Sequence, residues 1–425
     1  MSQWRETTLG EVADLLVGFA FKSAAFSEDP TDVRLLRGVN IGQGFLDWGR
    51  GAFWPDHQAH GSRYELEPGD IVLAMDRPWI EAGLKRARLR SGDLPALLVQ
   101  RVTRLRGTSA VRTSFVHHLI GSETFSRYIQ GMVTGTTVPH ISQSQIGAFT
   151  FRLPPLTDQD VICEVLDALD DLIENNRRRV EVLEEMARAV YREWFVHFRY
   201  PGHDDAALVD SPLGPIPEGW EVVPLIGAAR VTMGQSPRSE HYNTEGVGKP
   251  FHQGVTDFGT HLPTHRKYCT VDGRSATDGD VLVSVRAPVG RLNLADTTLV
   301  IGRGLAAVRS RDDGQQSLLF GHLKEVFAEE DSMGGGTIFK AIGKKELEQV
   351  QVLRVPSELA ERADQVLSAK SDLIRALTFT NRRLASIRDL LLPKLVTGQI
   401  DVSSMDLEAL VAIGDDLRKP SAESM

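Results

Sequence analysis

Two long stretches of the chain place apolar residues at alternating steps of three and four positions, the spacing of a coiled-coil contact face. The first series is Ile162, Val165, Leu169, Leu172, Asn176, Arg179, Leu183, Met186 and Val190. The second series is Ala363, Val366, Lys370, Leu373, Leu377, Thr380, Leu384, Ile387 and Leu391. Both series last more than three heptads and coincide in register. They predict two long helices that pack on each other along a seam of Leu169, Leu172, Leu183, Met186, Leu373, Leu377, Leu384 and Ile387.

The starts of the two helices also correspond. Pro154-Pro155 and Pro356 precede them, and Thr157, Asp158 or Ser357 can serve as an N-cap. The alternative is that each apolar series is the buried stripe of a helix packed on its own domain. The polar seam positions Asn176, Arg179 and Lys370 would then need no partner, whereas on a mutual seam they can fix the register.

The rest of the chain contains a second sign of duplication, a long internal repeat of three segments in the same order. WRETTLGEVADLLVG, starting at Trp4, corresponds to WEVVPLIGAARVTMG, starting at Trp220. EPGDIVLAMDRP corresponds to TDGDVLVSVRAP, where a Gly-Asp turn leads into a β-branched run. GTTVPHISQSQIGAFTFRLPPL, starting at Gly135, corresponds to GGTIFKAIGKKELEQVQVLRVPSEL, starting at Gly335. Three ordered matches predict two homologous halves.

These patterns divide the chain into six predicted parts. The segment that connects the two halves, residues 199–219, is rich in Pro, Gly and Asp. The parts are a first globular domain (1–157), a first long helix (158–198), a connector (199–219), a second globular domain (220–355), a second long helix (356–400) and an acidic tail (401–425).

Composition neither excludes nor demonstrates nucleic-acid binding. The formal net charge is -9, which by itself is unfavourable for a protein that binds phosphates. However, the acidic residues concentrate in residues 158–195 and 401–425, so the two globular regions are close to neutral. Hydrophobic residues make up 41% and charged residues 25% of the chain, which is ordinary for a globular protein.

Sorting signals and thiol chemistry are also unremarkable. The N-terminal residues do not resemble a secretory signal, and no apolar run approaches a membrane span, so we expect a cytoplasmic protein without a membrane partner. Cys163 and Cys269 are far apart and have no neighbouring thiol or imidazole at zinc spacing. We expect both to be buried, reduced side chains and expect no metal site.

Several of these segments resemble the DNA specificity subunits of type I restriction-modification systems, and the resemblance covers nearly the whole chain. The strongest matches are LIENNRRRVEVLEEMARAVYREWFVHF from Leu172 and TNRRLASIRDLLLPKLVTGQI from Thr380. Others are MGQSPRSEHYNTEG, DVLVSVRAPVG, IGRGLAAV and TIFKAIGKKELE in the second half, and GFAFKSAAFSED and TVPHIS in the first.

The resemblance implies an α+β fold, in which two mixed α/β target recognition domains are separated by two long antiparallel helices that form a coiled coil with pseudo-two-fold symmetry. It implies that each domain reads one half of a bipartite site in double-stranded DNA, and that the helices set the spacer length. Two modification subunits would supply S-adenosylmethionine-dependent adenine methylation, and restriction subunits would supply ATP- and Mg-dependent translocation and cleavage. The chain itself would bind no cofactor and catalyse nothing.

Base recognition requires Arg, Asn or Gln facing base edges, while Lys, Arg, Ser and Thr contact phosphates. The turn-rich loops supply the candidates. In the first half they are Lys22, Ser23, Arg37, Asn40, Arg77, Thr136, Thr137 and His140. In the second half they are Gln235, Ser236, Arg238, Gln253, Arg286, Thr337 and Lys340. For each, a solvated loop residue is an equally good interpretation.

Two basic clusters have competing interpretations. Arg86, Arg88, Arg90, Arg101, Arg104 and Arg106 alternate with apolar residues, which is typical of a half-buried strand with one wet face. Phosphate contact and plain solvation explain that face equally well. Arg177-Arg178-Arg179 is most simply an exposed helical face paired with nearby Glu, and otherwise a contact for DNA or a partner subunit.

A catalytic function finds little support in the motifs. GVGKP, from Gly246, lacks the first Gly and the Ser or Thr of a phosphate-binding loop. There is no HExxH, no acid-x-Lys pair and no Asn-Pro-Pro-Tyr, and the adjacent His117-His118 is more simply structural. Two alternatives remain: a coiled-coil adaptor that binds proteins, and a divergent self-contained DNA methyltransferase or nuclease.

Overall fold

The structure is a computed structural model that describes residues 4–49, 51–55, 63–80, 83–132, 139–203, 206–332 and 341–402. The chain divides into two compact units. The first unit comprises residues 1–173 and 383–425, and the second comprises residues 174–382. Each long helix, α5 (Leu156–Phe195) and α9 (Ser357–Val396), contributes one part to each unit.

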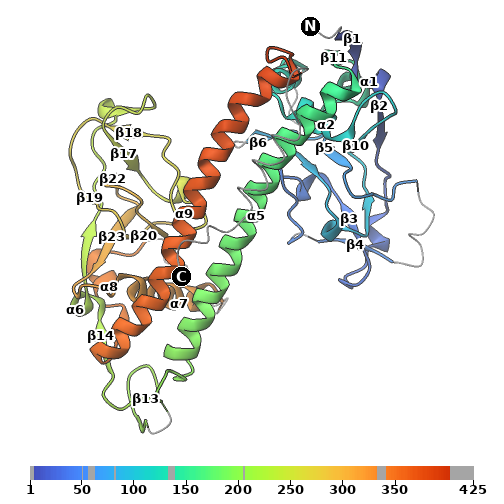
Figure 1. Ribbon diagram of the computed structural model, residues 1–425. Helices are drawn as coiled ribbons and strands as arrows, with labels where there is room; N and C mark the ends of the chain where they lie inside the picture. Colours follow the sequence, from blue (N-terminus) through green and yellow to red (C-terminus); the bar gives the residue numbers. More distant parts are fainter. Residues whose placement is uncertain are drawn as a thin grey trace. The chain divides into compact units, whose positions relative to one another are not determined.

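The first unit is built around a four-stranded antiparallel sheet in the order β2-β10-β5-β8 (Figure 1). These strands are β2 (Ala13–Val17), β10 (Val102–Gly107), β5 (Ile71–Ala74) and β8 (Arg86–Arg88). The central strand β5 is buried along its whole length, as expected for its IVLA sequence. The short strand β1 (Arg5–Thr8) pairs with β11 (Thr150–Leu153), so the first and last segments of the domain meet.

Smaller elements complete the first unit. A second sheet has the order β4-β3-β9, and Trp79 to Leu84 contains the pair β6 and β7. The bounds are β3 (Val33–Leu36), β4 (Phe53–Trp54), β6 (Trp79–Ile80), β7 (Gly83–Leu84), β9 (Ala96–Leu98), α1 (Leu9–Val12), α2 (Thr113–Gly121), α3 (Glu123–Met132) and α4 (Gln143–Gly147).

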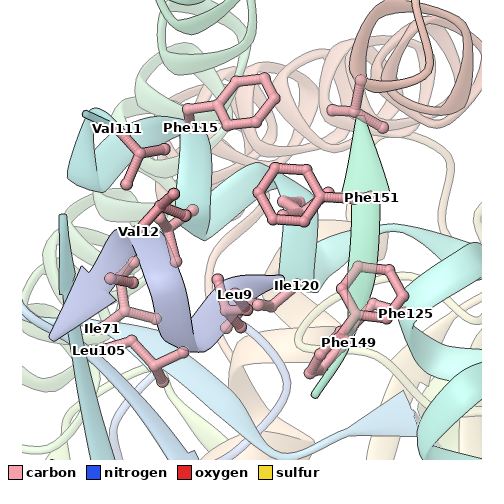
Figure 2. Packing of buried hydrophobic residues seen from close by; sticks show 14 of the residues in the cluster. Leu9, Val12, Ile71, Leu105, Val111, Phe115, Ile120, Phe125, Phe149 and Phe151 are labelled. Atoms are coloured by element: carbon pink, nitrogen blue, oxygen red, sulfur yellow. The ribbon is translucent and has the colours of Figure 1, made fainter. Parts of the chain in front are cut away.

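The largest hydrophobic core of this unit lies between the sheet, the short helices and the long helices. Figure 2 shows Phe115 of α2 and Phe151 of β11 among the aliphatic residues from α1, β5 and β10. The same cluster contains Ile162 and Leu166 of α5 and Leu392 and Leu395 of α9. The domain therefore shares one core with the ends of both long helices, and burial of this apolar surface holds them together.

The second unit repeats the architecture of the first. Its main sheet has the order β15-β23-β20-β21, which matches the first sheet strand for strand, and β14 pairs with β24 as β1 pairs with β11. The bounds are β14 (Glu221–Pro224), α6 (Leu225–Ala228), β15 (Ala229–Met233), β20 (Val281–Ser284), β21 (Leu292–Leu294), β23 (Leu305–Ser310) and β24 (Gln351–Arg354). The predicted internal repeat is confirmed by this shared topology.

The second unit differs in its second sheet, which has five short strands in the order β16-β18-β17-β22-β19. These are β16 (Tyr242–Asn243), β17 (Lys249–His252), β18 (Tyr268–Cys269), β19 (Ser275–Ala276) and β22 (Leu299–Ile301). Two helices cover the main sheet, α7 (Gln316–Ser332) and α8 (Lys344–Glu348). The connecting segment carries β12 (Leu208–Val209) and β13 (Ile216–Pro217).

The two long helices contact each other within each unit. In the second unit Asn176 meets Asn381, Val180 packs with Ile374 and Leu377, and Tyr191 clusters with Leu367. In the first unit Asp170 meets Arg388. Since contacts in the second unit move backward along α9 as they move forward along α5, the predicted antiparallel helix pair is confirmed there.

The observed seam differs in detail from the predicted one. Leu377 is buried and Leu183 packs beside it, and Leu169, Leu172 and Leu384 are half-buried. However, Met186, Leu373 and Ile387 are exposed by 49%, 40% and 46%. Val180 and Ile374 are buried one position away from the predicted Arg179 and Leu373. An α-helix of 3.6 residues per turn drifts from a strict 3.5-residue repeat, and this drift moves the contact by one position.

Two simpler predictions concern the thiols and the membrane. Cys163 and Cys269 are both buried and free, as predicted. Across the described ranges no helix combines the length and apolar character needed to cross a membrane.

Candidate nucleic-acid interface

Three loops of the second unit converge on a hollow of about 370 Å³ beside the main sheet. Gln253 follows β17, Arg286 follows β20, and Arg303 and Gly304 precede β23. All three arise where a buried hydrophobic strand ends, which is where loops can expose polar side chains. Gln253 and Arg286 are among the residues predicted from the sequence, and the structure brings them together.

A hydrogen-bonded chain orders one wall of this hollow. The backbone N–H of Arg303 donates to Ser236 Oγ at 3.1 Å, and the Ser236 hydroxyl donates to Gln253 Oε1 at 2.8 Å. Ser236, another predicted residue, therefore connects the loop before β23 to the loop after β17. The side chains of Gln253, Arg286 and Arg303 are exposed.

The first unit carries different chemistry at the equivalent place. Asp76 follows β5 and makes an isolated bridge with His140, as Arg286 follows β20 and makes one with Ala341. The Asp76 carboxylate accepts from Arg101 Nη1 at 2.7 Å and lies 2.6 Å from His140 Nδ1. His140 is a predicted residue, and here it belongs to a charged cluster at the strand end.

The other predicted residues of the first unit are dispersed. Lys22 and Ser23 are exposed on one loop, and exposed Arg77 adopts a φ of 42° while its backbone N–H donates to Pro139. Asn40 is a correction to the prediction, because its side chain is fully buried and donates to the Asp47 carbonyl at 2.9 Å. It also accepts from the backbone of half-buried Arg37, so the polar side chain stabilises a turn instead of facing solvent.

In the second unit Gln235 and Arg238 are exposed near Ser236, and Arg238 lies 3.9 Å from Glu240. Thr136, Thr137, Thr337 and Lys340 lie outside the described residues.

The arginine-rich stretch of the first unit proves to be engaged within the fold. Arg106 donates to Asp70 at 2.7 and 2.9 Å, Arg104 pairs with Asp14, and Arg88 pairs with Asp167 at 2.9 Å. These three arginines are therefore neither free to contact phosphate nor simply solvated, the two interpretations that the sequence left open. By contrast, Arg177 and Arg178 form helical pairs with Glu181 and Glu174, which confirms the predicted exposed face.

Charged contacts attach the first domain to the long helices. Asp170 of α5 accepts from Arg388 of α9 at 2.9 Å, and Asp167 of α5 accepts from Ser114 at 2.5 Å and lies 2.9 Å from His118 Nε2. Burial alone would raise the pKa of Asp170, but its interactions with His117 and Arg388 hold that pKa well below the ordinary value. Asp170 is therefore a carboxylate at neutral pH.

His117, His118 and Asp170 offer ligand atoms within 4.8 Å of one another. Two features disfavour a cation there. First, burial lowers the pKa of Arg86 only to about 10, so this guanidinium remains positively charged beside His117. Second, the Asp170 carboxylate already accepts a hydrogen bond from Arg388. Burial also lowers the pKa of His117 to about 3, so the imidazole is neutral. The pair serves the attachment of α2 to α5, consistent with a structural role.

The second unit has an analogous attachment made of different residues. Glu184 of α5 lies 2.7 Å from His261 Nδ1 and accepts from Lys324 Nζ of α7 at 2.9 Å. Burial opposes ionisation of Glu184, but His261 and Lys324 together lower its pKa to about 2. On α9, Arg382 donates to Asp296 at 2.9 Å and Arg375 to Asp278 at 2.6 Å. The second domain is thus tied to both helices by carboxylates, whereas the carboxylates Asp167 and Asp170 tie the first domain to α5.

The sequence analysis missed Asp76, Arg101 and Arg303 as members of the two loop clusters. Arg303 carried a signal, because it lies between two glycines in IGRGLAAV. A Cβ on Gly304 would approach the Gln253 carbonyl oxygen to 2.4 Å, so the loop requires glycine where it passes Gln253. Two glycines around one exposed arginine indicate a loop that presents that side chain.

The comparisons with known proteins agree with this architecture. Residues 1–185 match the family model of the type I restriction modification DNA specificity domain. A putative type I restriction enzyme MjaX specificity subunit from Methanocaldococcus jannaschii is 34% identical over 267 residues, which are 62% of each chain. The EcoAI specificity subunit from Escherichia coli is 37% identical over 169 residues, 39% of this chain and 28% of that subunit.

The chain is therefore similar in sequence to the DNA specificity subunits of type I restriction enzymes. The solved S subunit from M. genitalium has a TM-score of 0.60 with 14% identity, covering 93% of this chain and 96% of that one. This likeness confirms the predicted fold class of the specificity family. The chain spans 62% of the length of the MjaX subunit and less of the EcoAI subunit.

Proposed function

We propose that the chain is the DNA sequence-specificity subunit of a type I restriction-modification complex. The observation that carries the proposal is the repeated domain: one topology built twice, with different charges at equivalent strand ends. Two similar scaffolds with different loops suit the reading of two different half-sites. The recognition domains would be residues 1–157 and 220–355, with the connector 199–219 between the two halves and the acidic tail 401–425 after the second helix.

The helices would act as a spacer and a docking surface. Residues 158–198 and 356–400 would hold the domains apart, so that their length sets the number of unread base pairs. Two modification subunits carrying S-adenosylmethionine and restriction subunits using ATP and Mg would assemble on them in the cytoplasm. All catalytic steps would belong to those partners, while this chain binds double-stranded DNA.

Mapping of methylated adenines in the genome tests the function directly. Expression of this chain with its modification partner in a host lacking the system should create one bipartite methylated motif. Replacing residues 1–157 with the domain of a relative should change one half of the motif and leave the other half unchanged. A change in both halves at once would contradict independent reading by the two domains.

The spacer function has its own test. Inserting one heptad into each long helix adds about 10.5 Å of helix and keeps the seam in phase, which corresponds to about three base pairs. The spacer should lengthen by that amount with both half-sites unchanged. Lengthening the connector by seven residues is the matched control and should leave the spacer as it was.

A further inference from the structure

The side chains described around the hollow in the second unit present mainly hydrogen-bond donors. Ser236 accepts the N–H of Arg303 and uses its single proton on Gln253 Oε1. The Gln253 amide oxygen therefore already accepts one hydrogen bond within the chain, and its NH₂ group remains available. Because the Ser236 hydroxyl fixes this orientation, Gln253 contributes donors to the hollow.

Several acceptors of the wall are already engaged within the chain. The Ser284 hydroxyl donates to the Pro288 carbonyl at 2.7 Å and accepts the N–H of Arg291 at 2.8 Å. The backbone carbonyls of Gln253, Ser284 and Gly304 accept N–H groups of Gly304, Gly290 and Val285. The Ser284 hydroxyl and these three carbonyls are therefore already engaged, whereas the side-chain donors of the hollow are not.

Arg286 and Arg303 line the same hollow, and both are exposed. Among the residues that the structure describes, no carboxylate forms an ion pair with either guanidinium. Their N–H forks are thus available to an acceptor from outside the chain. In the first unit, Arg101 stands in the corresponding loop but is neutralised by Asp76.

The base edges in the major groove differ in what they offer. Guanine presents two acceptors, N7 and O6, whereas adenine pairs one acceptor with an NH₂ donor and cytosine presents a donor. A site made of donors matches guanine and opposes the NH₂ groups of adenine and cytosine. A planar guanidinium can satisfy both guanine acceptors at once.

We propose that Arg286 and Arg303 read guanine in the half-site of the second domain, with the Gln253 amide as an additional donor. The assignment rests on the proposed function and makes it specific: the half-site read by residues 220–355 contains at least one guanine recognised on its N7 and O6 edge. The first domain, with Asp76 at the equivalent position, recognises a base edge with a different pattern of hydrogen-bonding groups.

The test uses the complex of this chain with its modification subunits and duplexes carrying the methylated motif. Arg286→Ala and Arg303→Ala should each lower the preference for guanine at one position by about ten- to a hundred-fold, with the other half-site unchanged. Arg303→Lys keeps the charge but loses the fork, so it should not restore the preference. Arg230→Ala, which removes an exposed arginine on β15, is the matched control and should keep the full preference.

Replacing that guanine with 7-deazaguanine removes the N7 acceptor and gives an independent measurement. On the modified duplex, binding of the wild-type complex should fall toward the binding that the arginine variant, Arg286→Ala or Arg303→Ala, shows on the unmodified duplex. The variant that has lost its contact with this guanine should bind both duplexes equally. Thermal unfolding should be unchanged for all variants, because the replaced side chains are exposed.

Each other outcome has a definite meaning. If both variants weaken binding equally for every sequence and lower its salt dependence, the arginines hold phosphates and the assignment is wrong. If both keep the wild-type preference, they do not contact DNA and the assignment is also wrong, although the proposed function stands. A wild-type complex that creates no bipartite motif would instead reject the function itself.

Discussion

The loops after β5 and β20 occupy the same place in the two repeats but differ in charge. In the first unit Asp76 neutralises Arg101 and holds His140, so the loop is an internally satisfied cluster. In the second unit Arg286 takes the position of Asp76, and its guanidinium faces a hollow lined by donors. The comparison teaches that one backbone scaffold can present opposite chemistry through substitutions at a strand end.

The attachments to the helices differ in the same way. Asp167 and Asp170 hold the first domain, whereas Glu184 holds the second through His261 and Lys324. Both arrangements place an ionised carboxylate of α5 among cationic or imidazole groups, but the residues are not equivalent in sequence. The requirement for a fixed domain orientation is shared, while its chemical solution is not.

Removal of the Asp170 carboxylate should have the largest effect on stability. Arg388 would lose its partner on α5 and keep only its neighbour Asp389, and the buried charge of Arg86 would lose compensation. We expect Asp170→Ala to cost about 2–4 kcal/mol of unfolding free energy, at the lower part of the range for a broken buried pair because the site is partly exposed. Urea denaturation would measure this loss.

Neighbouring carboxylates provide the controls for this comparison. Asp171→Ala removes an exposed residue and should be neutral, as should Glu185→Ala beside Glu184. Glu184→Ala should cost less than Asp170→Ala, about 2 kcal/mol, because its cationic partner Lys324 is 34% exposed and can be solvated. Equal effects of Asp170→Ala and Asp171→Ala would show that the first attachment contributes nothing.

Sequence patterns were sufficient for the repeat and the helix pair because both depend on periodicity. The heptad steps located Leu183 and Leu377 on the seam, and the Gly-Asp turns located β5 and β20. The exact contact face was not predictable from spacing alone, since steps of three and four positions can be drawn through Val180 as well as through Arg179. Only packing against the partner helix decides which of them is buried.

The loop clusters were predictable only in part, because they join residues that are far apart in the sequence. Gln253 and Arg286 were identified as candidates by residue type and loop position, but no pattern places them beside Arg303. Asn40 has the same residue type as a base-reading side chain, yet the turn at Asp47 buries it. Polar residues that stabilise turns and those that face a ligand look alike until the tertiary contacts are known.

Acid should weaken the second unit more than the first. Burial lowers the pKa of His117 in the first unit to about 3, and that of His252 and His322 in the second unit to about 4. These imidazoles stay neutral when folded but take up a proton below about pH 6.5 when unfolded, so their contribution is complete above that pH and is lost as pH falls toward 4. At pH 5.5 each of these histidines therefore lowers the unfolding free energy by about 1.4 kcal/mol.

The expected loss is therefore about 1.4 kcal/mol for the first unit and about twice that for the second. Hydrogen exchange at pH 7 and 5.5, corrected for intrinsic rates, would report each unit separately. The carboxylates Asp170 and Glu184 do not interfere, since their lowered pKa values affect stability only below about pH 4.5. His197→Gln changes an exposed residue and should not alter how the unfolding free energy depends on pH. A larger loss of unfolding free energy in the first unit than in the second would contradict the role given to the buried histidines.

The smallest effect concerns the seam of the second unit, where Asn176 Nδ2 donates to Asn381 Oδ1 at 3.0 Å. Asn176 is only 9% exposed, so Asn176→Ala should cost about 1 kcal/mol, whereas Asn175→Ala at the exposed neighbouring position should be neutral. Replacing both seam asparagines with leucine should recover that stability, because an apolar pair needs no hydrogen bond. The double variant should nevertheless loosen the register, since a polar pair penalises every offset that separates it. Methylation by its complex would then spread over more than one spacer length, and a single unchanged spacer would show that the flanking apolar contacts fix the register without the asparagines.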